Sequence, residues 1–461
     1  MTLIVRSLLG ALLALVVGAV AWASEPTAPE ARPDPAPVLV VSSPTDPARQ
    51  LLAVPAIAAS ASASSSSPDD EVVVHPDDLR QPWWGTGAAL TDSSVQLLAH
   101  RPDLVRDLYD AHQPGGARLN LLRLPLSATD FSPRLWTWRL DGTTARPVRA
   151  ERAAVALARA IRAQRPGLRV VGAPWSAPAS MKTSGTVRGG ALSDSALGAY
   201  ADLLVGQVRW LASHGLPLWA VTLGNEPGYS SDYASMAMSD AQMAALALRV
   251  TPALDSAGTR LWALDHNWSD RGRVDALLGA AGAAFDGAAF HCYGGDPGQM
   301  AELPVPRLVT ECTGTTGSAT GTFAWDARNL VARAVAAGSS GLMMWNLALD
   351  PAHGPVDPGS LWGCRTCRGL LTVGPEGVVR EPEFFTLAHL SRAADPGARV
   401  VGVDGPSWLN LAAFRNRDGT VGVFGQNSTG STRTVHFTAG ATSLSYEVGP
   451  GEMFTFRAPL S

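Results

Sequence analysis

Residues Trp219–Tyr229, with the sequence WAVTLGNEPGY, decide how the rest of the chain is interpreted. Apolar residues alternate with small or polar ones from Trp219 to Leu223, and this period of two residues predicts a β-strand. The alternation ends at a glycine, and Asn-Glu-Pro follows where a loop begins. Pro227 fixes its own φ angle and so sets the direction in which the chain leaves Glu226. A carboxylate at the C-terminal end of a strand occupies the position at which (β/α)8 barrels carry their catalytic groups.

A second stretch has the same construction. The apolar run Arg307–Thr310 also predicts a strand, and it also ends on a carboxylate, Glu311. One such glutamate is most simply a solvated loop residue, whereas two of them at strand ends in one α/β chain need another explanation. A glycosidase places its acid/base and its nucleophile in this way. The pair of Glu226 and Glu311 therefore predicts a glycosidase site.

Strands and helices alternate between residues 71 and 382. Apolar runs predict eight strands, at Trp84–Ala88, Leu119–Leu124, Arg169–Ala173, Trp219–Leu223, Arg260–Leu264, Ala288–His291, Leu308–Thr310 and Gly341–Trp345. Amphipathic patterns predict helices between them, at Val95–His112, Val148–Ala163, Ser195–His214, Asp240–Ala257 and Trp325–Ala337. This alternation favours an α/β fold, a parallel (β/α)8 or TIM barrel over residues 71–382. A doubly wound sheet is the alternative, but no glycine-rich phosphate loop opens any predicted helix.

The pattern changes after about Pro382, where the helical period disappears. Six short runs predict strands, at Arg399–Val403, Leu409–Arg415, Val421–Asn427, Thr434–Thr438, Ser443–Val448 and Met453–Arg457. Asp-Gly and glycine-rich turns separate them, so residues 383–461 are expected to form a C-terminal β-sandwich domain. The predicted strand Glu71–His75 precedes the barrel, and residues 71–80 are candidates to join the sandwich sheet.

The N-terminal segment predicts export. Residues 1–23 have the layout of a signal peptide, with Arg6, an apolar run and an Ala-Trp-Ala cleavage site. An uncleaved membrane anchor is the alternative, but the apolar run is short for a full span. Residues 24–70 are rich in Pro, Ala and Ser and are expected to form a disordered spacer. Since no other run is long and apolar enough to cross a bilayer, we expect a secreted, extracellular protein.

Composition argues against other classes of partner. The formal net charge is −4, which provides no basic surface for nucleic acid. The nine histidines include no H-E-x-x-H or comparable ligand set, so we expect neither a metal nor another cofactor. The protein is expected to act as a monomer.

The four cysteines fit an exported protein. Cys364 and Cys367 form a C-x-x-C sequence without a second such pair, which favours a loop-closing disulfide over a redox pair or half a zinc site. Cys292 and Cys312 each follow a strand-end residue by one position. Buried free thiols are the expectation for this second pair, and a bridge between neighbouring strands is the alternative.

Polar and aromatic residues gather at the predicted strand ends. In strand order, from the second to the eighth, they are Arg123 and Asp130, Trp175, Asn225 and Glu226, Asp265–Trp268, His291 and Tyr293, Glu311, and Trp345 and Asn346. In a parallel barrel all these ends lie on one rim. Their convergence predicts a single site there.

Together these motifs resemble glycoside hydrolase family 30, the glucosylceramidase and β-1,6-glucanase group. The resemblance extends from Trp84 to the C-terminus, with GTGAALTDSS, LNLLRLPLSATDFS, APWSAPASMKTSG, LGNEPGYSSDYASM, LDHNW, FHCYGG, VTECTG and WNLALD in the family's order. Asn-Glu-Pro alone occurs in many barrel glycosidases, whereas the ordered set is specific. The family also has a C-terminal sandwich after its barrel.

The resemblance implies a retaining β-glycoside hydrolase, with Glu226 as acid/base and Glu311 as nucleophile. A nucleophilic carboxylate must stay ionised, so we expect Arg123 and Tyr293 to contact Glu311 and to lower its pKa. The charge of Glu311 is expected to raise the pKa of Glu226, which must hold a proton until it meets the glycosidic oxygen.

The same resemblance implies the substrate-binding residues, which are Arg123, Asp130, Trp175, Asn225, His291, Tyr293 and Trp345. Asn225 is expected to bond the sugar 2-hydroxyl, and Asp130 and Trp175 to bind the far hydroxyls of the sugar unit. Trp345 is expected to form the floor of the pocket. The implied substrate is a β-linked glucan, oligosaccharide or glycolipid, with endo and exo action both open.

The chain departs from the family pattern on the rim. Cys292 stands where an aromatic residue is usual, and Met344 stands where an aspartate is frequent. The segment HGPVDPGSLWGCRTCRG, residues 353–369, replaces an asparagine-containing loop. Linkage and acceptor preference therefore stay open. The alternatives are a family 30 enzyme for a β-xyloside, β-galactan or β-fucoside, a catalytically silent glycan-binding barrel and a metal-dependent hydrolase.

Overall fold

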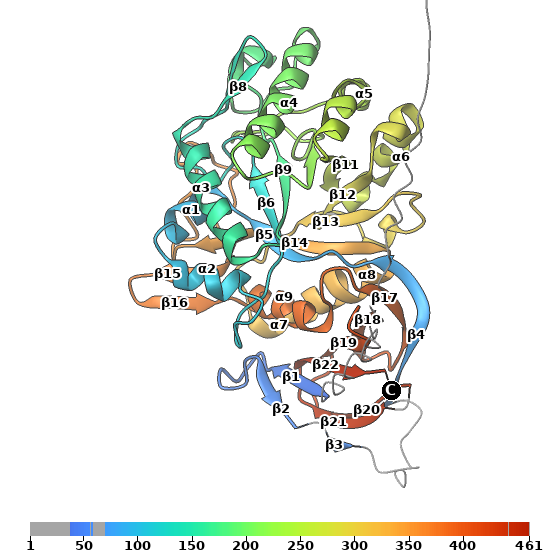
Figure 1. Ribbon diagram of the computed structural model, residues 1–461. Coiled ribbons are helices and arrows are strands. Elements are labelled where there is room, and N and C mark those ends of the chain that lie inside the picture. The colour runs from blue at the N-terminus through green and yellow to red at the C-terminus, as the bar shows by residue number, and fades with distance from the viewer. Residues whose placement is uncertain (1–36, 56, 59–69, 441, 461) are drawn as a thin grey trace, which may run out of the picture. The chain divides into compact units, whose positions relative to one another are not determined.

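The computed structural model describes residues 37–55, 57–58, 70–440 and 442–460, in which eight parallel strands close into a barrel (Figure 1). Each strand pairs with its neighbours in chain order, and the last pairs with the first. They are β5 (Gly85–Ala89), β6 (Leu121–Pro125), β9 (Arg169–Ala173), β10 (Ala220–Thr222), β11 (Arg260–Asn267), β12 (Gly287–His291), β13 (Arg307–Glu311) and β14 (Ser339–Leu349). The predicted (β/α)8 barrel is confirmed.

Helices connect the barrel strands. They are α1 (Asp92–Leu98), α2 (Pro102–Tyr109), α3 (Arg149–Gln164), α4 (Leu197–Ser213), α5 (Asp240–Ser256), α6 (Arg271–Ala281), α7 (Ala319–Trp325), the π-helix η7 (Asp326–Arg333), α8 (Ala334–Ala336) and α9 (Pro382–Ala393). A hairpin of β7 (Arg139–Asp141) and β8 (Thr144–Arg146) lies between β6 and α3. The helix predicted over residues 95–112 is two helices, because Pro102 favours a helix start over a helix interior.

Apolar side chains fill the barrel at the N-terminal ends of its strands. Trp84, Trp219 and Trp262 pack against one another there, with ring centroids 5.0, 5.4 and 5.7 Å apart. They share one cluster with the buried side chains of Leu121 and Met343. This cluster leaves the C-terminal strand ends as the polar end of the barrel.

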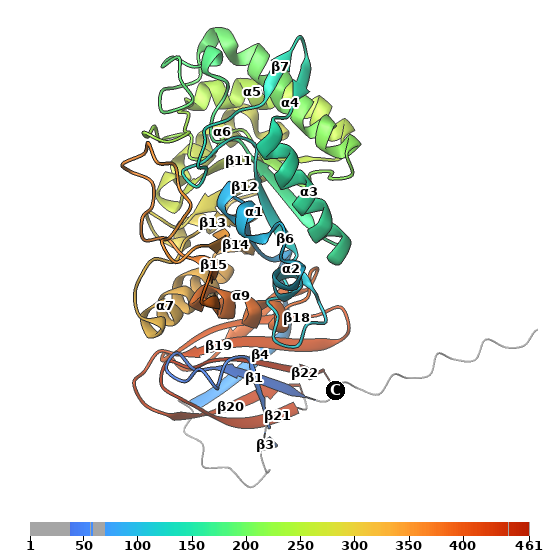
Figure 2. The same ribbon diagram turned by 90° about the vertical axis from the view of Figure 1, so that its left-hand side faces the viewer.

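The eighth strand, β14, extends beyond the barrel. Its second half pairs with β15 (Gly369–Gly374), which forms a hairpin with β16 (Gly377–Arg380). Residues 350–368, which connect β14 to β15, form a long segment that we call the rim loop. In Figure 2 the orange rim loop stands away from the barrel strands.

A second sheet contains ten strands in the order β2-β1-β22-β19-β18-β17-β4-β20-β21-β3. They are β1 (Val38–Ser42), β2 (Leu52–Val54), β3 (Ile57–Ala58), β4 (Glu71–Pro82), β17 (Arg399–Asp404), β18 (Leu409–Arg415), β19 (Thr420–Asn427), β20 (Arg433–Ala439), β21 (Thr442–Val448) and β22 (Met453–Pro459). The sheet curls over its own core, where Phe437 packs on Phe454 and Phe456 at centroid distances of 5.3 and 5.4 Å. The expected sandwich is thus one curled sheet.

The N-terminal strands correct the expectation of a disordered spacer over residues 24–70. Val38–Ser42 pairs antiparallel with β22, and Leu39 and Val41 lie in the core of the curled sheet. The segment as a whole is poor in apolar bulk, but this short run is buried once β22 supplies its partner. Such a distant partner leaves no local pattern. Residues 24–36 and 59–69, like the predicted signal peptide 1–23, lie outside the described residues.

The helix α9 corrects the expectation that helical structure ends near Pro382. It packs on β5 of the barrel, on β15 beside the barrel, and on β19 and β22 of the curled sheet. All of its residues except Ser391 are buried. A helix buried on every side has no polar face, so it lacks the amphipathic period that predicts helices from sequence. The boundary between the two domains follows α9 and does not fall at residue 383.

All four cysteines are in disulfides. Cys364 is bonded to Cys367, and Cys292 is bonded to Cys312 with their Cα atoms 5.2 Å apart. The expectation of free thiols at the second pair is wrong, because β12 and β13 are adjacent parallel strands that bring both residues side by side. Within the described part of the chain, no helix has the combined length and apolar character that a membrane crossing requires.

Candidate active site

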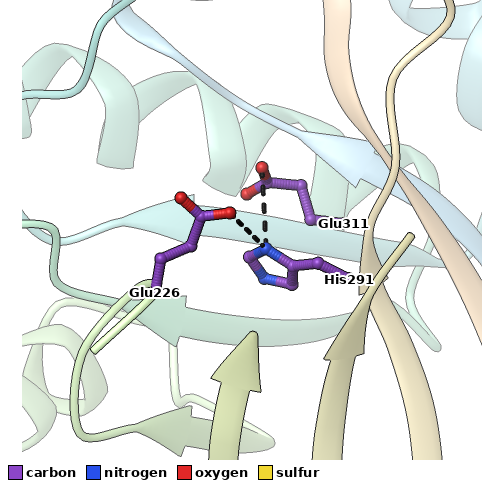
Figure 3. Close-up of side chains that lie close together, drawn as sticks. All are labelled: Glu226, His291 and Glu311. Carbon is purple, nitrogen blue, oxygen red and sulfur yellow. Dashed lines mark hydrogen bonds and ion pairs between the residues drawn. The ribbon is translucent and has the colours of Figure 1, made fainter. Parts of the chain in front are cut away.

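Glu226 and Glu311 face each other at the C-terminal end of the barrel (Figure 3). Glu311 is the last residue of β13, and Glu226 lies in the loop that follows β10. A carboxylate oxygen of one lies within 4.8 Å of a carboxylate oxygen of the other. The fold therefore brings together the two glutamates that the sequence predicts as a pair.

The backbone at Glu226 is held in an unusual conformation. Its φ angle is +45°, in the left-handed region that residues with a side chain rarely adopt. Its N–H donates to the carbonyl of Asp265 at 2.9 Å, and its carbonyl accepts from the N–H of Tyr229 at 2.8 Å. Strain of this kind persists where the surroundings enforce it, often at functional sites. These bonds fix the loop that carries the Glu226 carboxylate.

His291, the last residue of β12, lies between the glutamates and is fully buried. Its Nδ1 is 3.1 Å from Glu226 and 3.9 Å from Glu311, and its Nε2 is 3.1 Å from Asp265. Burial lowers the pKa of His291, but the charge of Glu311 and the hydrogen bonds to Asp265 and Glu226 outweigh burial and raise it to about 9. At neutral pH His291 is therefore an imidazolium that donates from both ring nitrogens.

Arg123 of β6 is the second buried cation of the site. It donates from Nη1 to Glu311, and from Nη2 to Asn225 at 2.7 Å and to Asp265 at 2.9 Å. Its guanidinium carbon lies 4.5 Å from the ring centroid of Trp175. One planar guanidinium thus orients three acceptors, which a lysine in its place would not do.

Asp265 is the residue whose role the sequence did not reveal, since it appeared only as one polar residue at the end of the fifth strand. It is fully buried and accepts hydrogen bonds from Arg123, His291, Thr222 and Thr310. Burial raises its pKa, but the charge of Arg123 and the hydrogen bond from His291 outweigh burial and hold the pKa well below its usual range. Asp265 is therefore a permanent carboxylate between two cations.

A β-bulge in β11 accompanies this placement of Asp265. Leu264 and Asp265 have φ angles of +70° and +68°, and the register with β12 shifts between Leu264 and His266. Bulges re-aim side chains next to active sites. The sequence LWALDHN gives no sign of the bulge, because neither glycine nor asparagine marks the two left-handed positions.

The ionisation of the two glutamates differs from the expectation. Burial raises the pKa of Glu311 in spite of the positive charges of His291 and Arg123, and the charge of Glu226 raises it further. Burial also acts on Glu226, but the hydrogen bond and charge of His291 outweigh burial and lower its pKa. The expected directions are the reverse, because they take no account of the burial of Glu311 or of a protonated His291 beside Glu226.

Two more expected contacts involve Tyr293 and Asn225. The Tyr293 hydroxyl donates to Glu311 at 2.9 Å, so Glu311 is held by both expected partners, Arg123 and Tyr293. The side-chain carbonyl of the buried Asn225 accepts from Arg123, which leaves its amide N–H groups to donate. Asn225 is thereby prepared to act as a hydrogen-bond donor.

Trp175 and Trp345 form an aromatic wall. Their rings stack with centroids 4.9 Å apart, and Arg123 lies over both rings at 4.5 and 5.7 Å. Asp130 lies in the loop after β6, where burial and the charge of Glu311 raise its pKa to about 7 against a backbone hydrogen bond from Cys364. All the predicted site residues thus lie in one charge-coupled cluster or on its walls.

Glu226, His291 and Glu311 are also the one group among the described residues whose ligand atoms are close enough together for a metal ion. A histidine binds a metal through an unprotonated ring nitrogen. In this structure His291 Nδ1 instead lies 3.1 Å from Glu226, a distance at which a proton can pass between the two side chains.

A parallel barrel whose rim holds two facing carboxylates, a buried arginine and an aromatic wall defines a glycoside hydrolase. Residues 84–302 match the family model described as the glycosyl hydrolase family 30 TIM-barrel domain. Residues 84–302 therefore form a glycosyl hydrolase family 30 TIM-barrel domain, and the chain is an O-glycosyl hydrolase, as its resemblance to that family predicts.

Relatives within the family differ in their activities. Endo-1,6-beta-D-glucanase neg1 of Aspergillus fumigatus is 29% identical over 392 residues, which cover 75% of this chain and 78% of that protein. Lysosomal acid glucosylceramidase of Mus musculus is 26% identical over 170 residues, which cover 34% of this chain and 33% of that protein. Among solved structures, the endo-beta1,6-glucanase BT3312 has a TM-score of 0.83 at 23% identity and covers 92% of this chain and 99% of its own.

Proposed function

We propose that the protein is an exported, retaining endo-1,6-β-glucanase, with Glu226 as acid/base and Glu311 as nucleophile. The separation of the two carboxylates carries the proposal. Retaining enzymes hold their carboxyl groups about 5–5.5 Å apart, and inverting enzymes about 6.5–9.5 Å apart to admit a water. Oxygens within 4.8 Å of each other support the retaining arrangement.

In the first step a Glu311 oxygen attacks the anomeric carbon while the bond to the leaving oxygen breaks. Glu226 transfers its proton to that oxygen, so the products are a glycosyl ester on Glu311 and a free sugar hydroxyl. In the second step Glu226 takes a proton from water, and the hydroxide adds to the anomeric carbon as the ester bond breaks. Glu226 is then protonated again, and both groups return to their starting state.

The contact between His291 and Glu226 explains how a glutamate with a lowered pKa acts as an acid. The imidazolium Nδ1–H is 3.1 Å from Glu226 Oε1, within reach of direct proton transfer. Transfer of this proton gives a neutral imidazole and a protonated Glu226. Bound substrate excludes water from the site and brings no charge of its own. It therefore favours neutral His291 with protonated Glu226 over the pair in which both side chains are charged. His291 is thus the proton reserve of Glu226.

The surrounding residues bind the sugar unit being cleaved. Asn225 donates from its amide to the 2-hydroxyl, a bond that strengthens in the transition state. Asp130 and Trp175 bind the far hydroxyls, and Trp345 forms the floor. Arg123 and Tyr293 hold Glu311 in position for attack.

The β-1,6 linkage and the endo action are supported by the relatives. The fungal endo-1,6-β-glucanase matches three quarters of this chain, whereas the mouse glucosylceramidase matches one third. A polysaccharide is too large to enter a cell intact, which fits the predicted signal peptide and an extracellular site of action.

Azide rescue tests the two roles. Replacement of Glu311 by Ala removes the nucleophile, so activity should fall by several orders of magnitude, and azide should then give the α-glycosyl azide by direct displacement. Replacement of Glu226 by Ala should abolish cleavage of poor leaving groups but leave dinitrophenyl β-glucoside able to glycosylate Glu311. Azide should then give the β-glycosyl azide. The same anomer from both variants would rule out the assignment.

Product analysis tests the substrate. The enzyme should release oligosaccharides of mixed length from a linear β-1,6-glucan and should leave β-1,3-glucan, β-xylan and glucosylceramide largely intact. A wild-type protein that cleaves neither aryl β-glucosides nor any of these substrates would point instead to a silent glycan-binding barrel. Activity that survives chelation would exclude a metal-dependent hydrolase.

A further inference from the structure

The rim loop carries the two most exposed large apolar side chains of the described residues. Leu361 is 88% exposed and Trp362 is 75% exposed, and the next most exposed, Leu248, reaches only 58%. Adjacent apolar side chains so fully in water are costly unless they meet a partner. The pair lies in residues 353–369, one of the segments in which the chain departs from the pattern that it otherwise resembles.

The tip of the rim loop is held firmly from beneath. The carboxylate of Asp232, in the loop after β10, accepts from Ser360 Oγ and from the N–H of Leu361, both at 2.6 Å. The N–H of Gly363 donates to Ser360 Oγ at 2.8 Å, which tightens the turn behind the tip. Trp362 is therefore presented on an anchored turn.

Two further links brace the base of the rim loop. Arg188 donates to both carboxylate oxygens of Asp357, at 2.5 and 2.7 Å, and the Cys364–Cys367 disulfide closes the turn that follows the tip. Binding through a surface that is already fixed loses less conformational entropy than binding through a mobile one. An exposed tryptophan held in this way is suited to binding.

The rim loop is continuous with the active site through Asp130. The N–H of Asp357 donates to the Asp130 carbonyl at 2.7 Å. A Cβ atom on Gly363 would lie 3.5 Å from the Cβ of Asp130. Gly363, the residue that follows Trp362, therefore lies close to Asp130, a residue of the sugar pocket.

We propose that Trp362, with Leu361 beside it, is a platform for a glucose unit of the polysaccharide that lies beyond the unit bound by Asp130. This platform rests on the proposed function, since only a polymeric substrate reaches it. A β-linked pyranose exposes an apolar face of C–H groups, and the indole offers a large flat apolar surface with few rotatable bonds. The platform therefore serves long substrates and is not used by a small glycoside.

A length series of substrates tests the platform. Trp362→Ala, Trp362→Phe and wild type are compared on an aryl β-glucoside, on β-1,6-linked gluco-oligosaccharides of increasing length and on a linear β-1,6-glucan. Wild-type kcat/KM should rise with chain length, because binding of remote units stabilises the transition state. Trp362→Ala should lose about tenfold on the long substrates, and less than twofold on the aryl glucoside. Trp362→Phe should retain most of the wild-type gain.

Leu248→Ala on the outer face of α5 is the control, because it removes an exposed apolar side chain far from the rim loop in sequence and should change neither value. An equal loss in Trp362→Ala on short and long substrates, or no loss on either, would overturn the platform. If Trp362→Ala weakened binding to anionic lipid vesicles but changed nothing on glucan, the tip would instead be a contact for a membrane surface.

The proposed function fails separately from the platform. If wild type leaves β-1,6-glucan intact but cleaves another β-linked polymer, the linkage is wrong, and the same variants on that polymer decide the platform. Binding of Glu311→Ala to the polymer provides a second readout. The added Trp362→Ala change should weaken this binding about tenfold, and equal binding would overturn the platform.

Discussion

At the scale of single residues, the site works as a small network of alternating charges. Arg123 and His291 are buried cations, and Asp265 lies between them as a buried carboxylate. The two glutamates complete the network on its open side. An isolated buried charge would be very costly, so each of these groups depends on its neighbours to stay ionised.

The pH profile of a His291 variant tests the proton reserve. His291 has a pKa raised to about 9, above the unfolded value of about 6.5, so its bonds to Asp265 and Glu226 are present at low pH and are lost as pH rises through about 9. Activity on substrates with poor leaving groups should therefore fall on the alkaline side near pH 9. In His291→Asn this fall should move to lower pH, because Glu226 must then hold its own proton.

A dinitrophenyl glucoside is the matched substrate for this variant. It needs no proton for its leaving group, so the alkaline limb of its glycosylation step should be less affected by His291→Asn. If the alkaline limb of the pH profile were the same in His291→Asn and wild type for substrates with poor leaving groups, His291 would have no part in protonating Glu226.

The sequence predicted the residues of the site better than their charges. Glu226 and Glu311 could be identified because each ends a strand, and strand ends meet on one rim of a barrel. The role of Asp265 depends on a β-bulge in β11 that no glycine marks in the sequence. The pKa shifts of Glu226 and Glu311 depend on the direction in which the His291 side chain points. Both are properties of the assembled barrel and leave no mark on the local pattern.

At the scale of elements, the disulfide between Cys292 and Cys312 joins the ends of β12 and β13. These residues follow His291 and Glu311 directly, so the bond holds the two strands at the site. The bonded residues are 20 apart in sequence, against three for Cys364 and Cys367. A longer closed loop removes more freedom from the unfolded chain.

Paired serine variants test this difference. Cys292→Ser with Cys312→Ser should lower the free energy of unfolding by about 3 kcal/mol, and Cys364→Ser with Cys367→Ser should lower it by less. Chemical unfolding of both double variants and of wild type measures it. Thiol titration of unfolded, unreduced wild type should find no free thiol. Four titrating thiols would disprove both bonds.

A buried histidine of α9, His389, is expected to make the protein less stable in acid. His389 is fully buried, with Nε2 2.9 Å from Ser42 of β1 and Nδ1 2.8 Å from Thr455 of β22. Burial and the charge of Arg392 lower its pKa to about 3, below the unfolded value of about 6.5. Its contribution to stability is therefore present above pH 6.5 and is lost as pH falls toward 3, at about 1.4 kcal/mol per pH unit.

Unfolding of wild type and His389→Gln between pH 7 and pH 4 measures this contribution. Glutamine fills similar space and bonds hydroxyl groups but does not titrate in this range. As pH falls, the free energy of unfolding of the variant should therefore decrease less steeply than that of wild type, by about 1.4 kcal/mol per pH unit. Identical slopes for the two proteins would show that His389 does not contribute to acid unfolding.

At the scale of the whole molecule, the strands β1, β2 and β4 belong to the same sheet as the C-terminal strands. β4 pairs with β17 and β20, and β1 pairs with β22. The pairing of segments so distant in sequence explains why a reading of local pattern assigned residues 38–42 to a spacer, while the six C-terminal strands, joined by short turns, were predicted correctly.

Two truncations test the importance of the N-terminal strands. A chain that begins at Pro37 keeps every described strand and should match the wild type in kcat/KM and in urea unfolding. A chain that begins at Glu71 lacks β1, β2 and β3, and the loss of β1 leaves the edge of β22 unpaired and opens the core around Phe454. It should unfold at lower urea concentration and aggregate more readily. Equal stability of the two chains would show that these strands are dispensable.

In the sequence, the barrel is inserted between β4 and β17, two paired strands of the curled sheet. This insertion also sets an order of folding. The chain enters the barrel after β4 and leaves it before β17, where Trp83 and Ala398 are joined by a backbone hydrogen bond of 2.8 Å. Before the barrel forms, pairing β4 with β17 requires closure of a loop of several hundred residues, at a high cost in entropy. A folded barrel brings both ends together and removes most of that cost. We therefore expect the catalytic barrel to fold first and the sheet to close last.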